Sequence, residues 1–328
     1  METTEKAKRG KVVFVEPRGV HANVFARFMN IPMLGPLYLG TIARQAGYDV
    51  TILNENILAR NVLAEELADA DILCVSCMTA TIRWGNTIAK QYKDLRTQMG
   101  LASRTIIGGI HASMIPEDVT DHFDQVFVGE AETKILDVLS GRITDKVVYG
   151  ERLEDLDSTP IPDFHLLKDY HKMDKKPIMT SRGCPYDCTF CSVTEMFGRG
   201  YRTKSVARVM EEIRAYNSKR LFFVDDHFVV NKRRTEAILE GIQALDYKIV
   251  WSCQLRTEVS KDRDLVAGMR SAGCSMVYIG FESINPEALK QVHKGQSVED
   301  IKRSIQIFKQ NRIGVHGMFM FGMDADRP

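Results

Sequence analysis

The sequence predicts an α/β protein in which a doubly wound parallel sheet is followed by a partial (β/α) barrel. Short apolar runs alternate with amphipathic stretches from about residue 11, and the same alternation restarts near residue 177. The chain has 328 residues, which is enough for about two domains of ~150 residues each. We therefore predict one domain over residues 1–141, a linker over 142–176 and a second domain over 177–328.

The composition is that of an ordinary globular protein, with 44% hydrophobic and 27% charged residues. The net charge of +1 gives no electrostatic reason to expect nucleic acid or an anionic membrane surface as a partner. Apolar runs fall far short of the ~18 residues that span a bilayer, so we expect no membrane span. The seven cysteines form no disulfide-like framework, which favours a reducing compartment and a cytoplasmic protein.

In the first domain, five apolar runs read as parallel strands that are buried on both faces. Amphipathic patterns between them predict helices near residues 37–46, 80–95, 117–123 and 133–139. In such a sheet, ligands bind at the carboxyl ends of the strands. The predicted strands cover residues 12–15, 50–53, 72–75, 105–107 and 126–128.

The linker is acidic, contains Pro160 and Pro162, and shows no sustained period, as is typical of a connector. After it, each strand-like run is followed by a helical pattern, and Ser205 and Ser297 are positioned to cap two of these helices. Polar residues at the ends of these strands indicate a barrel with its site on that face. The predicted strands cover residues 178–180, 221–224, 249–253, 276–280 and 315–321.

The first strand of the second domain leads into Cys184, Cys188 and Cys191, with the spacing C-x3-C-x2-C. Three thiolates on one loop can hold three corners of a cubane iron–sulfur cluster, and the fourth iron is left open to a substrate or cofactor. The alternatives are a structural zinc site or ordinary free thiols. Zinc sites usually draw four ligands from paired motifs, and a second pair is missing here. The loop therefore predicts a [4Fe–4S] cluster.

This cysteine loop resembles the signature of the radical S-adenosylmethionine (SAM) enzymes, in which it follows the first barrel strand. Phe190 is similar to an aromatic residue that packs beside the cofactor in that family. The resemblance implies that the reduced cluster cleaves SAM to a 5′-deoxyadenosyl radical. It also implies that side chains at the later strand ends bind SAM. The alternative is that these side chains only form charge pairs with one another at the barrel mouth. These are Asp225 and Asp226 for the amino group, with Asp226 the less direct, and Arg256, Glu282 and Ser283 for the carboxylate and ribose.

The first domain resembles a cobalamin-binding domain, which has a flavodoxin-like sheet. The third strand ends in Ser76-Cys77-Met78, and the fourth ends in Gly108-Gly109 with His111 shortly after. A small hydroxyl and two positions without side chains leave a slot for the nucleotide tail of the cofactor. The resemblance therefore implies cobalamin as a further cofactor, with its site at Ser76, Met78, Gly108, Gly109 and His111.

Two features of the first domain depart from related patterns. The loop after the first strand, 16–21, does not match the D-x-H-x-x-G motif of many cobalamin domains, so His21 is either a cobalt ligand or a solvent-facing residue, and the axial ligand stays undetermined. Cys74 and Cys77 lie within an apolar strand, which favours core thiols over a metal site. This also counts against the methylthiotransferase branch of the radical family.

We predict a radical SAM enzyme that transfers a methyl group to an unactivated carbon, with a small-molecule or lipid-like substrate. The resemblance also implies an electron donor such as flavodoxin or ferredoxin. A cobalamin-dependent cyclase or rearrangement enzyme is an alternative within the same scaffold, and a non-catalytic cobalamin or iron–sulfur protein is an alternative of another class. The chain stops directly after the fifth strand of the second domain, so we expect a truncated barrel.

Overall fold

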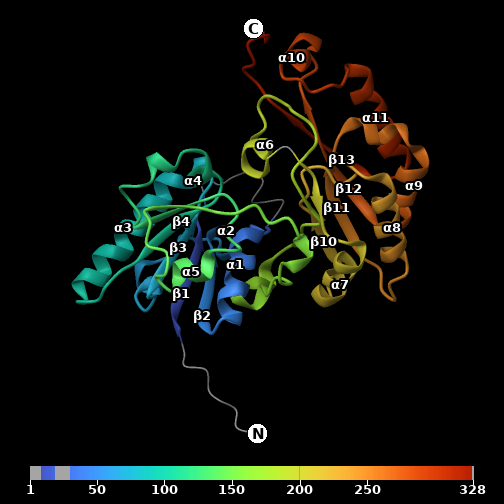
Figure 1. The fold of residues 1–328 in the computed structure, drawn as a ribbon. Coiled ribbons are helices and arrows are strands. Elements are labelled where there is room, and N and C mark those ends of the chain that lie inside the picture. The colour runs from blue at the N-terminus through green and yellow to red at the C-terminus, as the bar shows by residue number, and fades with distance from the viewer. Residues whose placement is uncertain (1–8, 19–29, 199, 327–328) are drawn as a thin grey trace. The chain divides into compact units, whose positions relative to one another are not determined.

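The computed structural model describes residues 9–18, 30–198 and 200–326 (Figure 1). His21, considered above as a cobalt ligand, lies outside the described residues. The chain forms two compact units: unit 1 contains residues 1–154 and 158–174, and unit 2 contains residues 155–157 and 175–328. None of the helices in the described part of the chain has the length and apolar character of a membrane span.

Unit 1 is built on a six-stranded parallel sheet with the strand order β2-β1-β3-β4-β5-β6. The order reverses between β1 and β3, which is the switch point of a flavodoxin-like doubly wound sheet. The predicted fold class is thus confirmed for this half of the chain. The strands are β1 (Arg9–Glu16), β2 (Tyr48–Asn54), β3 (Ile72–Ser76), β4 (Thr105–Gly108), β5 (Gln125–Val128) and β6 (Val147–Tyr149).

The two faces of this sheet bury alternate residues of each strand. Val13 and Val15 of β1 join a core with Tyr92 of α3, whose hydroxyl donates to the Ala70 carbonyl at 2.9 Å. Phe14 points to the opposite face, which α1 and α5 cover. The helices are α1 (Leu34–Gln45), α2 (Glu55–Leu58), α3 (Ile82–Gln98), α4 (Ile110–Met114) and α5 (Ile135–Leu139).

Two expectations for this unit were wrong. The sheet has a sixth strand, β6, within the segment expected to be only a connector. The helix expected near 117–123 is a single 3-10 turn, Pro116–Asp118, after which Val119 and Phe123 pack into the core without a continuous helix. Residues 158–174 also belong to unit 1, where the Lys168 N–H donates to the Ile52 carbonyl at 2.9 Å.

Unit 2 contains a five-stranded parallel sheet with the order β13-β12-β11-β10-β7, so each strand pairs with the next strand of this sheet along the chain. This is the arrangement of a partial (β/α) barrel, as predicted. A two-stranded antiparallel ribbon, β8 (Ser181–Arg182) with β9 (Arg202–Thr203), brackets the cysteine loop. The sheet strands are β7 (Lys176–Ile178), β10 (Arg220–Phe223), β11 (Val250–Leu255), β12 (Cys274–Glu282) and β13 (Gly314–Phe319).

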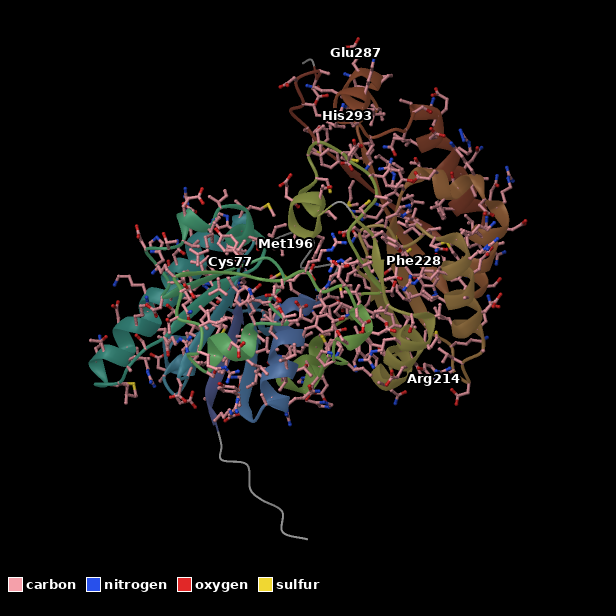
Figure 2. All side chains as sticks on the ribbon, viewed as in Figure 1. Cys77, Met196, Arg214, Phe228, Glu287 and His293 are labelled. Atoms are coloured by element: carbon pink, nitrogen blue, oxygen red, sulfur yellow. The ribbon has the colours of Figure 1, made fainter. Side chains whose placement is uncertain are left out.

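Five helices of unit 2, α7 to α11, begin at a side-chain cap, whereas α6 has none. Ser205 accepts from the Arg208 N–H at the start of α7, and Ser297 forms a capping box with Asp300 at the start of α11. Phe228, labelled in Figure 2, packs against Phe223 with tilted rings whose centroids are 4.6 Å apart, and both side chains are buried. The helices are α6 (Ser192–Phe197), α7 (Val206–Tyr216), α8 (Lys232–Gln243), α9 (Arg263–Ser271), α10 (Pro286–Gln291) and α11 (Val298–Gln310).

Candidate active site

The cysteine loop leaves β8 through Gly183, whose φ of +85° and close contacts require glycine. A Cβ atom at this position would lie 2.2 Å from the Gly200 carbonyl oxygen. The loop then closes on itself, because the Cys191 N–H donates to the Cys188 carbonyl at 3.0 Å. Cys191 also serves as the residue before α6. The backbone of the loop is thus fixed at both of its ends.

All three cysteines of the loop line one solvent-open cavity in unit 2. The carboxyl ends of four sheet strands supply the other walls, as expected for a barrel site. The predicted residues Phe190, Asp226, Arg256 and Glu282 line this cavity together with the three cysteines. It also contains residues that the sequence did not single out, among them Tyr186, Gln254, Tyr278, Lys294 and Met318.

Each cysteine sulfur has a nitrogen donor beside it. Cys184 accepts from the Tyr186 N–H and Cys191 from the Val193 N–H, while Arg256 Nη1 donates to the Cys188 sulfur at 3.6 Å. Burial raises the pKa of the Cys184 and Cys191 thiols, and these donors act in the opposite direction. Such N–H donors are a feature of thiolates that ligate iron–sulfur clusters.

The donor set therefore fits a [4Fe–4S] cluster. In the part of the chain that the structure describes, no three His, Cys, Asp or Glu side chains are grouped as they would be around a single metal ion. Three thiols around a shared cavity suit a polynuclear cluster, with Cys184, Cys188 and Cys191 as its ligands.

The adjacent aspartates after β10 have different environments. Asp225 is 1% exposed, and its carboxylate accepts from the Thr180 N–H at 3.1 Å, the Thr180 hydroxyl at 3.0 Å and the Ser181 hydroxyl. Asp226 lines the cavity and accepts from the Gly183 N–H. Burial and the neighbouring Asp225 raise the pKa of Asp226 to about 6. Asp226, which we expected to be the less direct of the two aspartates, is thus the one that lines the cavity.

Glu282 ends β12 in a left-handed conformation, with φ of +59°. Its carboxylate pairs with Lys294 Nζ at 2.8 Å, and both side chains are about nine-tenths buried. The same ammonium lies 5.6 Å from the centre of the Phe190 ring. Ser283 does not line the cavity; its hydroxyl accepts from the Asn285 N–H at 3.0 Å, which leads the chain into α10.

Glu258, which no sequence pattern indicated, contacts three polar side chains beside the cysteine loop. It accepts from Arg256 Nε at 3.0 Å and from the Tyr186 hydroxyl at 2.8 Å, and His227 Nε2 lies 3.6 Å away. Burial acts to raise the pKa of Glu258, but these contacts prevail and lower it to about 2. Glu258 is therefore an anion at neutral pH. In the sequence, only the closeness of Glu258 to Arg256 could have indicated that the two side chains interact beside the cysteine loop.

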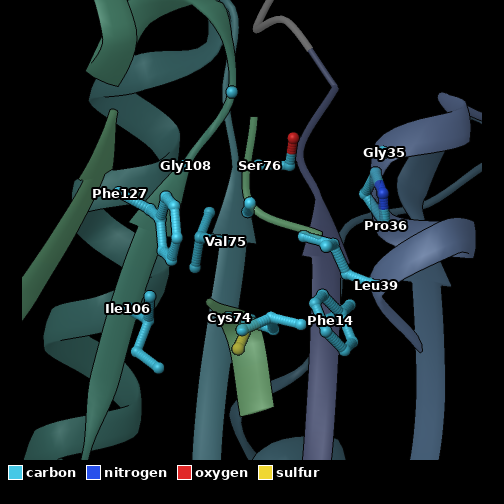
Figure 3. A pocket seen from close by; sticks show the side chains of 13 residues that line it. Phe14, Gly35, Pro36, Leu39, Cys74, Val75, Ser76, Ile106, Gly108 and Phe127 are labelled. Carbon is cyan, nitrogen blue, oxygen red and sulfur yellow. The ribbon is translucent and has the colours of Figure 1, made fainter. Parts of the chain in front are cut away.

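Unit 1 has a solvent-open cavity of its own at the carboxyl ends of β3 and β4 (Figure 3). Ser76, Gly108 and Gly109 line it, as the resemblance to a cobalamin-binding domain predicts. Its remaining walls are mostly apolar, with Phe14 and Phe127 on opposite sides in Figure 3. A small hydroxyl and side-chain-free backbone at the edge of an apolar slot fit the nucleotide tail of cobalamin.

Two residues assigned to the cobalamin site do not line this cavity. Met78 is 43% exposed at the start of the next turn. His111 is buried, and its ring nitrogens contact the Thr79 hydroxyl at 3.2 Å and Asp118 at 2.9 Å. Cys77, labelled in Figure 2, is a buried thiol as predicted, and burial raises its pKa to about 12.

Comparisons with known proteins identify the families of both domains. Residues 178–326 match the family model of the radical SAM superfamily, and residues 21–139 match that of the B12-binding domain. An uncharacterized methyltransferase of Pyrococcus horikoshii is 30% identical over 332 residues, covering 89% of this chain and 69% of the relative. The bacteriochlorophyllide d C-12(1)-methyltransferase of Chlorobaculum tepidum is 24% identical over 341 residues, covering 98% of this chain and 71% of the relative.

Other matches extend the range of the family. An anaerobic magnesium-protoporphyrin IX monomethyl ester cyclase of Rubrivivax gelatinosus is 25% identical and covers 96% of this chain. Among solved structures, the cobalamin-dependent SAM radical enzyme OxsB with aqua-cobalamin bound shares the fold, with a TM-score of 0.76 and 18% identity over 96% of this chain. This chain spans 50% of the length of OxsB and 63% of that of the cyclase.

The fold and the two cavities define a radical SAM enzyme that carries a cobalamin-binding domain. The chain belongs to the cobalamin-dependent radical SAM family. The predicted family, the order of its two folds and its three cofactors (a [4Fe–4S] cluster, SAM and cobalamin) are confirmed. The roles of individual residues around SAM and cobalamin stay predictions.

Proposed function

We propose that this protein cleaves SAM reductively and uses cobalamin to transfer a methyl group to an unactivated carbon. The observation that carries this proposal is the cavity in unit 2. It is lined by three cysteines, each with an N–H donor beside its sulfur, and by Asp226, Arg256 and Glu282. When bound, the cluster supplies the electron that breaks the carbon–sulfur bond of SAM, and cobalamin serves as the carrier of the methyl group. The named methyltransferases among the relatives favour methyl transfer.

The side chains of unit 2 have the chemistry needed to hold SAM. Asp226 faces the cavity with a carboxylate that can accept hydrogen bonds from the methionyl ammonium. Glu282, at the end of β12, can accept from ribose hydroxyls while Lys294 balances its charge. Phe190 is 38% exposed beside these groups and can form an apolar wall that excludes water.

The substrate that we propose is a small molecule or a lipid-like molecule. Support comes from relatives whose names specify a bacteriochlorophyllide and a hopanoid, both largely apolar compounds. Tyr278 and Met318 give the cavity of unit 2 a partly apolar lining that suits such a substrate. We also propose an electron donor of the flavodoxin or ferredoxin type. In addition, we propose a cytoplasmic location, because free cysteines and an oxygen-sensitive cluster favour a reducing compartment.

Cyclisation without methylation is a second candidate, because one relative is named as an anaerobic cyclase. Both reactions begin with the same cleavage of SAM, so the site in unit 2 does not separate them. The fate of the methyl group does. Methyl transfer consumes SAM as a methyl donor, whereas cyclisation leaves that group on methionine.

Anaerobic reconstitution with iron and sulfide tests the proposal. We expect the protein to bind a [4Fe–4S] cluster, retain cobalamin and release 5′-deoxyadenosine from SAM. Cys188→Ala should abolish this release, whereas Cys253→Ala, a buried thiol away from the loop, should retain it. SAM with a deuterated methyl group then distinguishes methylation from cyclisation. A protein that holds a cluster but never forms 5′-deoxyadenosine would refute the proposed radical chemistry.

A further inference from the structure

Arg256 is held on four sides beside the cysteine loop, and only 7% of the residue is exposed. Its Nε donates to Glu258 at 3.0 Å, and its Nη2 donates to the Lys294 carbonyl. Its guanidinium carbon lies 3.8 Å from the centre of the Tyr186 ring. The remaining edge is directed at Cys188, where Nη1 lies 3.6 Å from the sulfur. One edge of this fixed cation therefore faces a cluster ligand.

The groups that hold Arg256 are themselves anchored. The Tyr186 hydroxyl donates to the same Glu258 oxygen that accepts from Arg256, at 2.8 Å. Lys294 is fixed through its ion pair with Glu282 at 2.8 Å. A guanidinium has a rigid planar fork, so stacking on Tyr186 and two hydrogen bonds along its edges leave it little freedom to rotate away from Cys188.

We propose that Arg256 is a positioning residue that donates a hydrogen bond to Cys188 and thereby raises the reduction potential of the cluster. This inference rests on the proposed function, because it requires the cluster. Reduction adds a negative charge to the cluster, and a nearby fixed cation stabilises the reduced form more than the oxidised form. Hydrogen bonds to the sulfurs act in the same direction. The family resemblance instead predicts that Arg256 binds the carboxylate of SAM.

The reduction potential of the cluster tests this inference without any measurement of activity. We expect an EPR-monitored redox titration of the SAM-free protein to show a more negative potential for Arg256→Gln. A tenfold fall in the equilibrium constant for one-electron reduction corresponds to about 59 mV. Arg256→Lys keeps the charge without the planar fork and should give an intermediate potential. Arg263→Gln, an exposed position at the start of α9, should keep the wild-type potential.

Several outcomes would overturn the inference. One is a potential for Arg256→Gln equal to that of Arg263→Gln, and another is a loss of SAM affinity in equilibrium dialysis at an unchanged potential. If Arg256→Gln binds no iron, pulsed EPR of wild-type protein containing [15N]arginine replaces the titration. A guanidinium nitrogen coupled to the reduced cluster is expected, and its absence would exclude the contact. A wild-type protein that forms no cluster would instead refute the proposed function itself.

Discussion

The backbone of Gly109 passes so close to Cys77 that a side chain cannot be placed between them. A Cβ atom on Gly109 would lie 2.7 Å from the Cys77 carbonyl oxygen and 2.9 Å from its amide nitrogen. Gly109 also has φ of +94°, a conformation that glycine adopts at little cost. This approach joins the ends of β3 and β4 at the edge of the unit 1 cavity.

Gly109→Ala should therefore destabilise unit 1 by more than the conformational cost alone. That cost is about 1–3 kcal/mol for a strained backbone, and the collision with Cys77 adds to it. Gly141→Ala is the matched control, because Gly141 has φ of +76° but a Cβ atom there would meet nothing within 4 Å. Thermal unfolding of both variants measures the difference. Equal melting temperatures of the two variants would mean that the close approach of Gly109 to Cys77 does not affect stability.

Gly108→Ala should impair cobalamin binding without a comparable loss of stability. Gly108 lines the cavity, and a Cβ atom there would make only ordinary contact with Phe127, at 3.8 Å. The new methyl group would occupy space that we assign to the nucleotide tail, so we expect at least about tenfold weaker binding, equivalent to ~1.4 kcal/mol. Equilibrium dialysis monitored by cobalamin absorbance measures this. Gly268→Ala in α9 should bind cobalamin like the wild type, and unchanged binding by Gly108→Ala would contradict the assignment.

The sequence was sufficient to predict the strands that form continuous apolar runs, because burial on both faces leaves a strong pattern. It was insufficient for β6, which has only three residues, Val147–Tyr149, and whose Tyr149 is 64% exposed. It also could not distinguish Gly108 from Gly109. Both look alike in the sequence, and only the backbone geometry shows that a Cβ atom would make an ordinary contact on Gly108 but collide with a peptide group on Gly109.

The cysteine loop of the candidate site was predicted from its spacing, and Asp226, Arg256 and Glu282 were predicted from the resemblance of their strand ends to the family. Cys184, Cys188 and Cys191 lie on one loop, so their spacing alone indicated a shared ligand. By contrast, Lys294 and Arg256 are 38 residues apart and meet only because the turn after α10 folds over the cysteine loop. No local pattern marks such a contact, since it depends on how the strands and turns pack.

Exchanges at the two aspartates should separate a structural role from a cofactor-binding role. Asp225→Ala would leave the buried Thr180 N–H without its acceptor, so we expect destabilisation of about 2 kcal/mol. Asp226→Asn should preserve stability, because burial already disfavours the charge of this carboxylate, but should weaken SAM binding at least about tenfold, or ~1.4 kcal/mol. Urea unfolding and equilibrium dialysis with SAM measure the two effects. Tight SAM binding by Asp226→Asn would argue against contact with the ammonium.

We expect Glu16 to make the stability of unit 1 dependent on pH. It is 2% exposed, and its Oε2 accepts from the Met33 N–H at 2.9 Å and from Asn54 Nδ2 at 2.8 Å. Its other oxygen is buried and has no hydrogen-bond partner among the described residues. Burial raises the pKa of Glu16 from 4.5 to about 7, although the two hydrogen bonds oppose this change. The folded state therefore binds this proton more tightly than the unfolded state does.

Because the pKa is raised on folding, the stabilising contribution of protonated Glu16 is complete below pH 4.5 and is lost as the pH rises to about 7. At 1.36 kcal/mol per pKa unit, the loss is about 3 kcal/mol. We expect Glu16→Gln to remove this loss, so that its free energy of unfolding in urea falls less than that of the wild type between about pH 5 and about pH 8. Glu117→Gln changes an exposed glutamate and should keep the wild-type profile. If Glu16→Gln also keeps that profile, the buried carboxyl group is not the source of the pH dependence.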